Sequence, residues 1–340
     1  MSAEPLRIAL LSHNWEPTNG AGACARELYS ALEERAEVEL VVRPDELASV
    51  TGGLRSSGTK MLRAFRAWWL LRRRRVEVVI VNTTIQSSSV VAARLAGCHV
   101  VWWCHESGSS LQHPIMQTRW RLYDALSVRM VVPSNAVPVS MTPRIVIRNA
   151  LAAPVEMPSG PASQVLVLGT KSTTKDTDRL PDLLDPAQLA PGTSLAVIGD
   201  VVAHEGDLMA STRVRLANLW GDTLVWSEAK QDTDSIFRTA AVVIVPSRAD
   251  TRPRVVEEAL ARGIPVVASD LPGIREIRNE MDEGEYLTLT GEGDNWNAVV
   301  REAMSRGPQQ RHLMSNFTTR ELADSWVTLL LGLAEQSGPR

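Results

Sequence analysis

The segment from Val242 to Ile277 constrains the fold more than any other part of this chain of 340 residues. It reads VVIVPSRADTRPRVVEEALARGIPVVASDLPGIREI. Its two short β-branched runs are typical of strands buried in a parallel sheet, and the apolar residues between them recur at helical spacing. Gly263 supplies a left-handed stop for that helix. The segment therefore predicts a strand, a charged loop, a helix, a second strand and a glycine turn, as in a parallel α/β sheet.

The charged loop after the first strand is expected to lead straight into the helix. Thr251 is suited to cap that helix, and Pro253 to occupy its first position, where the missing N–H costs nothing. A loop at the carboxyl end of a parallel strand that feeds a helix N-terminus is a natural place to hold an anion. We therefore expect anion binding at this loop.

The same segment resembles the signature of the retaining glycosyltransferases of family 4, which have the GT-B fold. That signature places seven residues between an acidic residue and a glutamate, and a small residue and a G-x-PVVA strand follow. Asp250 and Glu258 occupy the two acidic positions, GIPVVASDLPG follows in register, and Pro253-Arg254 resembles a variant of the family. The first acid is usually Glu, so Asp250 is one methylene shorter. Taken singly, either acid favours the simpler interpretation, an ordinary charge on a surface helix.

The resemblance implies an α/β fold of the GT-B type, with two Rossmann-like domains and the active site in the cleft between them. The length of the chain suits two domains of ordinary size. We expect an N-terminal acceptor domain over 1–150 and a C-terminal domain that binds the nucleotide sugar over 164–316. Residues 151–163, rich in Pro, Ala and Gly, are expected to link them. In the family the last helix crosses back to the first domain, which is expected here of 319–333.

Composition narrows the class of protein. The apolar content of 44% and the charged content of 22% are those of a soluble globular chain. The net charge of −3 gives no reason to expect nucleic acid as a partner. Three cysteines favour a reducing compartment over a disulfide scaffold. No stretch is apolar enough to span a bilayer and no signal peptide precedes the first strand, so the expected location is the cytoplasm.

The resemblance also assigns cations and glycines to the donor diphosphate. Lysine occurs at only four positions, and two of them, Lys171 and Lys175, fall in one loop after a predicted strand. Lys175 occupies the family's lysine position; Thr170 replaces its arginine, and Lys171 stands next to it. Two phosphates need such charge compensation, above all at the leaving oxygen. No metal or other cofactor is then expected.

Three glycines match the family's tight turns loosely. Gly20 and Gly22 are expected in the loop after the first strand, where a residue without Cβ lets backbone N–H groups approach the donor. Gly199 is expected in the corresponding turn of the second domain. The same glycines also suit any tight strand-to-helix turn.

His105 stands at the carboxyl end of a predicted strand, where ligands gather in open α/β sheets. The string WWCHES resembles a variant found in enzymes that build polysaccharides, and the family's histidine at this strand end reaches the donor sugar. A structural histidine is the alternative. A metal site formed by Cys98-His99 and Cys104-His105 is rejected, because six residues of extended strand span about 20 Å.

The stretch Lys60–Arg75 combines tryptophans with basic residues on a predicted helix. Such a helix suits an anionic membrane interface, which would place the protein at the inner face of the membrane and favour a lipid-linked acceptor. The alternative is a helix packed on its sheet with solvated arginines, and an acceptor that is a small-molecule aglycone.

These patterns predict a retaining glycosyltransferase that moves a sugar from a nucleoside diphosphate donor, in polysaccharide, glycolipid or natural-product assembly. The resemblance implies that Glu258 accepts from the ribose hydroxyls and Asp250 contacts the transferring sugar. Lys175 is expected to hold the phosphates, with Lys171 or Arg254. The alternatives are an inactive GT-B scaffold acting as a partner subunit, or a sugar-nucleotide epimerase on the same fold. The departures at Thr170 and Asp250 favour the scaffold, whereas the joint presence of Lys175, Glu258 and the PVVAS strand favours an active enzyme.

Overall fold

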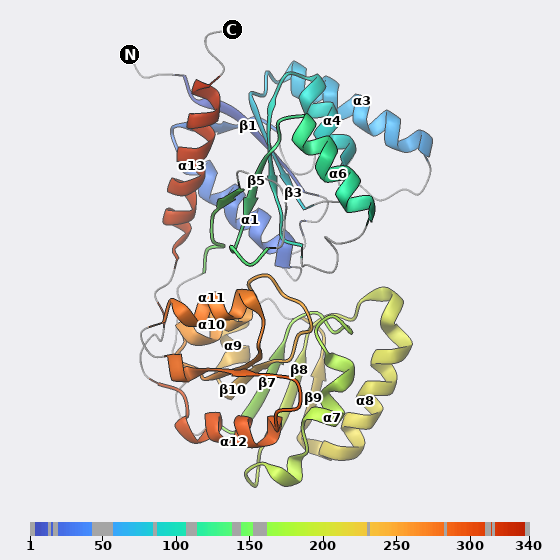
Figure 1. Ribbon diagram of the computed structural model, residues 1–340, viewed down its shortest axis with the longest axis vertical. Helices are drawn as coiled ribbons and strands as arrows, with labels where there is room; N and C mark the ends of the chain where they lie inside the picture. The colour runs from blue at the N-terminus through green and yellow to red at the C-terminus, as the bar shows by residue number, and fades with distance from the viewer. Residues whose placement is uncertain are drawn as a thin grey trace. The chain divides into compact units, whose positions relative to one another are not determined.

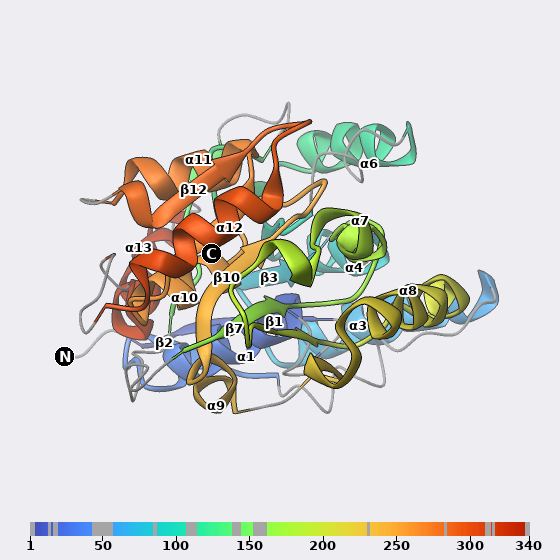
Figure 2. The same ribbon diagram turned by 90° about the horizontal axis from the view of Figure 1, so that it is seen from below.

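The computed structural model describes residues 4–12, 15, 20–42, 57–83, 87–106, 114–137, 144–151, 162–229, 232–281, 284–309, 314 and 317–336. The chain forms two compact units, Met1–Ala150 with Phe317–Arg340, and Leu151–Asn316. Each unit contains a parallel sheet of six strands with helices on both faces (Figures 1 and 2). The α/β prediction is therefore confirmed. Most of the expected linker, residues 152–161, lies outside the described residues.

The sheet of unit 1 has the strand order β2-β1-β3-β4-β5-β6. Its strands are β1 (Leu6–Leu11), β2 (Val38–Leu40), β3 (Val78–Asn82), β4 (His99–Trp103), β5 (Arg129–Val132) and β6 (Arg144–Val146). Its helices are α1 (Gly20–Glu33), α3 (Ser57–Arg73), α4 (Ser87–Leu95), α6 (Pro114–Ala125) and α13 (Thr319–Glu335). Apolar residues of α1 and α13 cover one face of the sheet, and those of α3, α4 and α6 cover the other.

The sheet of unit 2 has the order β12-β11-β10-β7-β8-β9. Its strands are β7 (Gln164–Leu168), β8 (Ser194–Ile198), β9 (Leu224–Ser227), β10 (Ala240–Val245), β11 (Val266–Ser269) and β12 (Leu287–Thr290). Its helices are α7 (Leu180–Leu183), α8 (Gly206–Trp220), α9 (Thr233–Phe237), α10 (Arg254–Ala261), α11 (Pro272–Asn279) and α12 (Trp296–Arg306). Because β8 and β9 follow β7 on one side while β10 begins the other, the strand order reverses between β7 and β10. In open α/β sheets ligands bind at such a reversal.

The segment that best predicted the fold forms β10, α10 and β11, and Gly263 has the expected positive φ of 69°. Two details of the prediction were wrong. Helix α10 begins at Arg254, because Pro253 has the extended angles φ −70° and ψ 115° and occupies the N-cap position expected for Thr251. The expected glycine turn is the start of helix α11, in which Gly273 is buried.

Candidate functional site

Lys175 and Asp250 form an ion pair at the carboxyl edge of the unit 2 sheet. Lys175 lies in the loop after β7 and Asp250 in the loop after β10, the two strands between which the strand order reverses. The Asp250 side chain is 10% exposed and that of Lys175 37% exposed. The structure thus brings together two predicted site residues that are 75 positions apart in the chain. An ammonium group on a partly open edge is suited to an anionic ligand.

Helix α10 places the other two predicted residues of this segment on one face. Arg254 Nη2 lies 3.4 Å from Glu258 Oε1, one turn along the helix. The side chains are 17% and 19% exposed, so both still reach solvent. The backbone carbonyl of Glu258 accepts a hydrogen bond from Arg262 Nη1 at 2.9 Å, which fixes the last turn. Since Arg254 is the first residue of α10, its cation and the positive end of the helix lie together.

A buried arginine, which the sequence analysis did not identify, anchors the loop that carries Asp250. The guanidinium of Arg252 is fully buried and lies 2.6 Å from Glu257 Oε1 and 2.7 Å from Glu280 Oε2. Burial lowers the pKa of Arg252, but the facing carboxylates of Glu257 and Glu280 more than reverse this effect, so its pKa is raised. In the sequence, the only indication of this role is that an arginine occurs in a segment whose other residues are typical of a loop. A Cβ on Gly273 would lie 1.7 Å from the carbonyl oxygen of Thr251, so α11 also packs directly on this loop.

Lys171 occupies a structural position. Its ammonium donates to the backbone carbonyls of Gly199 and, at 2.5 Å, of Ser227, and lies 4.8 Å from the ring centroid of Trp226. Burial lowers its pKa, partly offset by Asp200 and Glu228. The ammonium thus joins the ends of β8 and β9 instead of pointing outward. This geometry does not support the predicted contact with a diphosphate.

Gly199 permits close packing of two strand ends. It has a φ of 151°, and a Cβ there would lie 1.8 Å from the carbonyl oxygen of Gly169, at the end of β7. A position this crowded by backbone requires glycine. The predicted contact of Gly199 with a donor stays a prediction, while its packing explains the residue type.

The glycines of unit 1 lie elsewhere than expected. Gly20 and Gly22 form the first turn of α1 instead of a loop, and Gly22 is buried. The start of that helix is tied to β3, because Asn82 Nδ2 donates to the carbonyl of Ala21 at 2.9 Å and to Ser12 Oγ at 3.1 Å.

His105 lies two residues after the end of β4 in unit 1, at the carboxyl end where it was predicted. Its ring centroid lies 4.5 Å from that of Trp103, which in turn contacts Trp326 of α13 at 5.2 Å. Its backbone N–H donates to Glu106 Oε2 at 3.1 Å. Burial, helped by Glu106, raises the pKa of the adjacent Cys104 thiol, which disfavours the thiolate. Packing thus fixes the histidine, and its contact with a sugar stays a prediction.

Within the described ranges, no group of three or more His, Cys, Asp or Glu side chains is arranged to hold a metal ion. The expectation that no metal takes part stays a prediction. The cations described at this edge of unit 2 come from lysine and arginine side chains.

Part of the chain is similar in sequence to known glycosyltransferases. Residues 158–320 match the family profile described as "Glycosyl transferases group 1". The D-inositol 3-phosphate glycosyltransferases of Mycobacterium sp. strains KMS and JLS are each 30% identical to this chain over 131 residues. The alignment covers 38% of this chain and 28% of the length of each relative.

Comparison with solved structures extends over both units. Anabaena HepE, crystallised in complex with UDP-glucose, is similar with a TM-score of 0.70 and 17% identity, over 98% of this chain and 99% of HepE. Sucrose-phosphate synthase from Thermosynechococcus elongatus gives a TM-score of 0.66 and 16% identity, over 97% of this chain and 98% of its own. At these identities the likeness shows the fold. The chain therefore has the GT-B fold, and its residues 158–320 resemble the glycosyl transferases group 1 family.

Proposed function

We propose that this protein is a retaining glycosyltransferase that moves a sugar from a nucleoside diphosphate donor to an acceptor. The observation that carries the proposal is the pairing of Lys175 with Asp250 where the strand order of unit 2 reverses. The group 1 profile covers both residues. HepE, which shares the fold, was crystallised with UDP and with UDP-glucose, and this supports a donor of the same class.

The side chains of unit 2 suit the parts of such a donor. Lys175 compensates the diphosphate charge, with Arg254 and the N-terminus of α10. Asp250 accepts hydrogen bonds from hydroxyls of the transferring sugar. Glu258 accepts from the two ribose hydroxyls, a task for which a carboxylate offers two oxygens. His105 is proposed to contact the sugar near its reacting carbon.

The transfer breaks the bond between the anomeric carbon and the leaving oxygen of the diphosphate. A bond to the acceptor oxygen forms on the same face, and the acceptor proton passes to the leaving phosphate. Negative charge grows on that phosphate as the bond breaks, so Lys175 and the α10 terminus stabilise the transition state more than the ground state. The protein then contributes positioning and charge, and no metal is needed in this scheme.

Binding and turnover can be tested separately with a panel of UDP-, GDP- and ADP-sugars. Glu258→Ala is expected to weaken binding of the preferred donor at least tenfold, because two hydrogen bonds to a charged acceptor are lost. Glu302→Ala is the matched control, since Glu302 forms the same kind of pair, one helical turn from Arg306, on α12. Unchanged binding by Glu258→Ala would refute the ribose role. Binding without turnover would favour the inactive scaffold, and an isomerised nucleotide sugar the epimerase.

Helix α3 supports a contact with an anionic membrane. It packs on α4 through Ala64, Ala67 and Trp68. Its outer side carries exposed apolar residues and exposed arginines. These are Leu62 (52% exposed), Phe65 (59%), Trp69 (47%), Arg66, Arg72 and Arg73, and the exposed Arg74 and Arg75 follow the end of the helix. The side chain of Lys60 lies outside the described residues.

The spacing of the exposed residues on α3 places them on one stripe. Leu62, Phe65 and Trp69 follow one another by three and four positions, which brings them to one face of a helix. The guanidinium of Arg73 lies 5.0 Å from the ring centroid of Trp69. Among the described residues no helix is long and apolar enough to cross a bilayer. We propose that α3 lies in the headgroup region, which favours a lipid-linked acceptor and a position at the cytoplasmic face.

Vesicle sedimentation tests this contact. The protein is expected to sediment with phosphatidylglycerol vesicles and not with phosphatidylcholine vesicles, and a Phe65→Ser, Trp69→Ser double variant to bind about tenfold more weakly. Leu95→Ser, which changes a still more exposed apolar residue on α4, is the control. Equal sedimentation of the double variant and the wild type would refute the contact, and binding to both vesicle types would refute its electrostatic part.

A further inference from the structure

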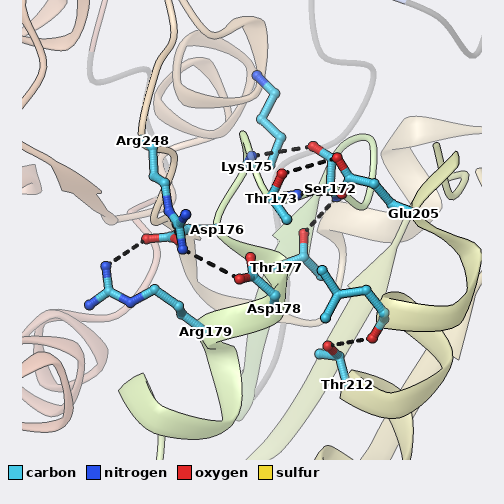
Figure 3. A network of polar contacts seen from close by, with 11 residues as sticks. Ser172, Thr173, Lys175, Asp176, Thr177, Asp178, Arg179, Glu205, Thr212 and Arg248 are labelled. Atoms are coloured by element: carbon cyan, nitrogen blue, oxygen red, sulfur yellow. Dashed lines mark hydrogen bonds and ion pairs between the residues drawn. The ribbon is translucent and has the colours of Figure 1, made fainter.

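The loop that carries Lys175 is held on two sides by side chains from other loops. On one side Glu205, which follows β8, accepts from the backbone N–H of Thr173 at 2.6 Å and from its hydroxyl at 3.0 Å. On the other side Arg248, which follows β10, donates its backbone N–H to the carbonyl of Thr174 at 2.9 Å. Figure 3 shows the loop between Glu205 and Arg248. The backbone on the N-terminal side of Lys175 is thus fixed by residues that the family signature does not assign.

The residue after Lys175 is held just as firmly. Asp176 has the left-handed angles φ 58° and ψ 25°, which a residue with a Cβ adopts at a cost and keeps when its contacts demand it. Its carboxylate is 5% exposed. Oδ1 accepts from Arg248 Nε at 2.5 Å, and Oδ2 from Arg179 Nη1 at 3.1 Å. Two guanidinium groups therefore fix the backbone on the C-terminal side of Lys175.

Arg248 also belongs to the other half of the site. It lies two residues before Asp250 in the loop after β10, and its guanidinium extends to Asp178 Oδ2 at 3.3 Å. The same residue therefore ties the loop of Asp250 to the loop of Lys175 through backbone and side chain.

We propose that Arg248 is a positioning residue for the donor diphosphate, which acts through Lys175. By holding Thr174 and Asp176, it fixes the backbone on both sides of the lysine and keeps the ammonium at the edge where the phosphates arrive. This inference rests on the proposed function, and specifically on the role of Lys175. A long lysine side chain loses conformational entropy when it binds an anion. Because the backbone on both sides of Lys175 is already fixed, less conformational entropy is lost on binding.

An ordinary surface ion pair in the same unit provides the matched control. Arg215 Nη2 lies 2.5 Å from Asp182 Oδ1, and the side chain of Arg215 is 49% exposed, against 50% for Arg248. The acceptors differ, because Asp182 is itself exposed while Asp176 is buried between two loops. Exposed pairs contribute little, so Arg215→Met removes an equivalent charge and pair without touching the loop of Lys175.

Calorimetric titration with UDP, GDP and ADP, continued with the tightest of the three, tests the proposal as a double-mutant cycle. Lys175→Met is expected to weaken diphosphate binding about thirtyfold, since a charge-assisted contact is lost. Arg248→Met is expected to weaken it about tenfold, and Arg248→Lys less, because one ammonium keeps the charge but not the fork. In the Lys175→Met background, Arg248→Met is expected to change binding less than twofold. Arg215→Met should bind as the wild type does.

The outcomes distinguish the positioning role of Arg248 from the proposed role of Lys175 in binding the diphosphate. A tenfold loss from Arg248→Met that persists in the Lys175→Met background would overturn the inference, because general damage to unit 2 does not depend on the lysine. Unchanged binding by Arg248→Met would also overturn it. Unchanged binding by Lys175→Met, or no binding of any of the three nucleotides by the wild type, would instead refute the proposed role of Lys175 and the inference with it.

Discussion

In unit 1 the strand order reverses between β1 and β3, and in unit 2 between β7 and β10. At the first reversal the described polar groups are neutral: buried Asn82 joins Ser12 to the start of α1. At the second they are charged, and Lys175 faces Asp250. The two parallel sheets differ in strand order, but each has one such reversal, so the reversal creates the position of a site and the side chains decide its ligand. An anionic donor is suited to unit 2.

Glycine use separates the two reversals further. The carbon that an alanine would add at Gly20 has no heavy atom within 4 Å, while at Gly199 it would lie 1.8 Å from the carbonyl oxygen of Gly169. The sequence assigns both glycines to the same task. The structure shows that in unit 2 the strand ends meet too closely for a side chain, whereas in unit 1 the space beside Gly20 is open.

The largest expected effect comes from Gly199→Ala. The added carbon meets backbone, which cannot swing away, and the φ of 151° is unfavourable for alanine, so we expect a loss of about 3–5 kcal/mol in the stability of unit 2. Gly20→Ala in unit 1 is expected to change stability by less than about 0.5 kcal/mol. Peptide-resolved hydrogen exchange measures the opening free energy of each unit. Equal losses of stability in the two variants would mean that the close backbone contact at Gly199 does not distinguish it from Gly20.

Asn82→Asp tests whether a carboxylate is destabilising at the reversal in unit 1, whereas unit 2 carries one, Asp250, at its own reversal. The new carboxylate would be buried, would lose the two hydrogen bonds that Asn82 donates, and would face the carbonyl oxygen of Ala21. We expect unit 1 to lose about 2–3 kcal/mol at pH 7, again measured by hydrogen exchange.

The pH dependence of the Asn82→Asp variant has a definite sign. Burial raises the pKa of the new carboxyl, so the folded state holds its proton at pH values at which the unfolded chain has lost it. The loss of stability should therefore be small near pH 4 and grow as the pH rises. A loss that does not depend on pH would mean that the missing amide donors, and not the charge, explain the effect.

The fold was accessible from the sequence because local signals and tertiary structure agree. Uniformly apolar β-branched runs such as VVIV and PVVA occur where strands are covered on both faces, and they predicted β10 and β11. Element ends were less accessible: Pro253 suits the first turn of a helix, yet the packing of its loop on α11 holds it extended at the cap. Such contacts join distant parts of the chain and leave no local pattern.

The candidate site was accessible only in part. The matched positions pointed to Lys175 and Asp250, but their pairing depends on β7 and β10 being neighbours, which no local pattern reveals. Lys171 shows the opposite case. Its position in the sequence suited a phosphate contact, but the neighbouring Trp226 and two strand-end carbonyls offer its ammonium a buried site. Which of two nearby lysines faces solvent is decided by strands that come later in the chain.

Asp250→Asn carries the smallest expected effect and sharpens the comparison most. The substitution keeps the shape and removes the charge that competes with a diphosphate for Lys175, so affinity for UDP is expected to rise about threefold, because a partly exposed pair is worth little. Transfer from the sugar donor should fall, since an amide accepts more weakly from sugar hydroxyls. Asp182→Asn, which breaks the exposed pair with Arg215, should change neither quantity. Calorimetry and initial rates measure both. If affinity for UDP falls instead, Asp250 aligns the Lys175 ammonium for the phosphates and does not compete with them. The ion pair at the reversal in unit 2 is then part of a preformed binding site, and the donor does not have to break it.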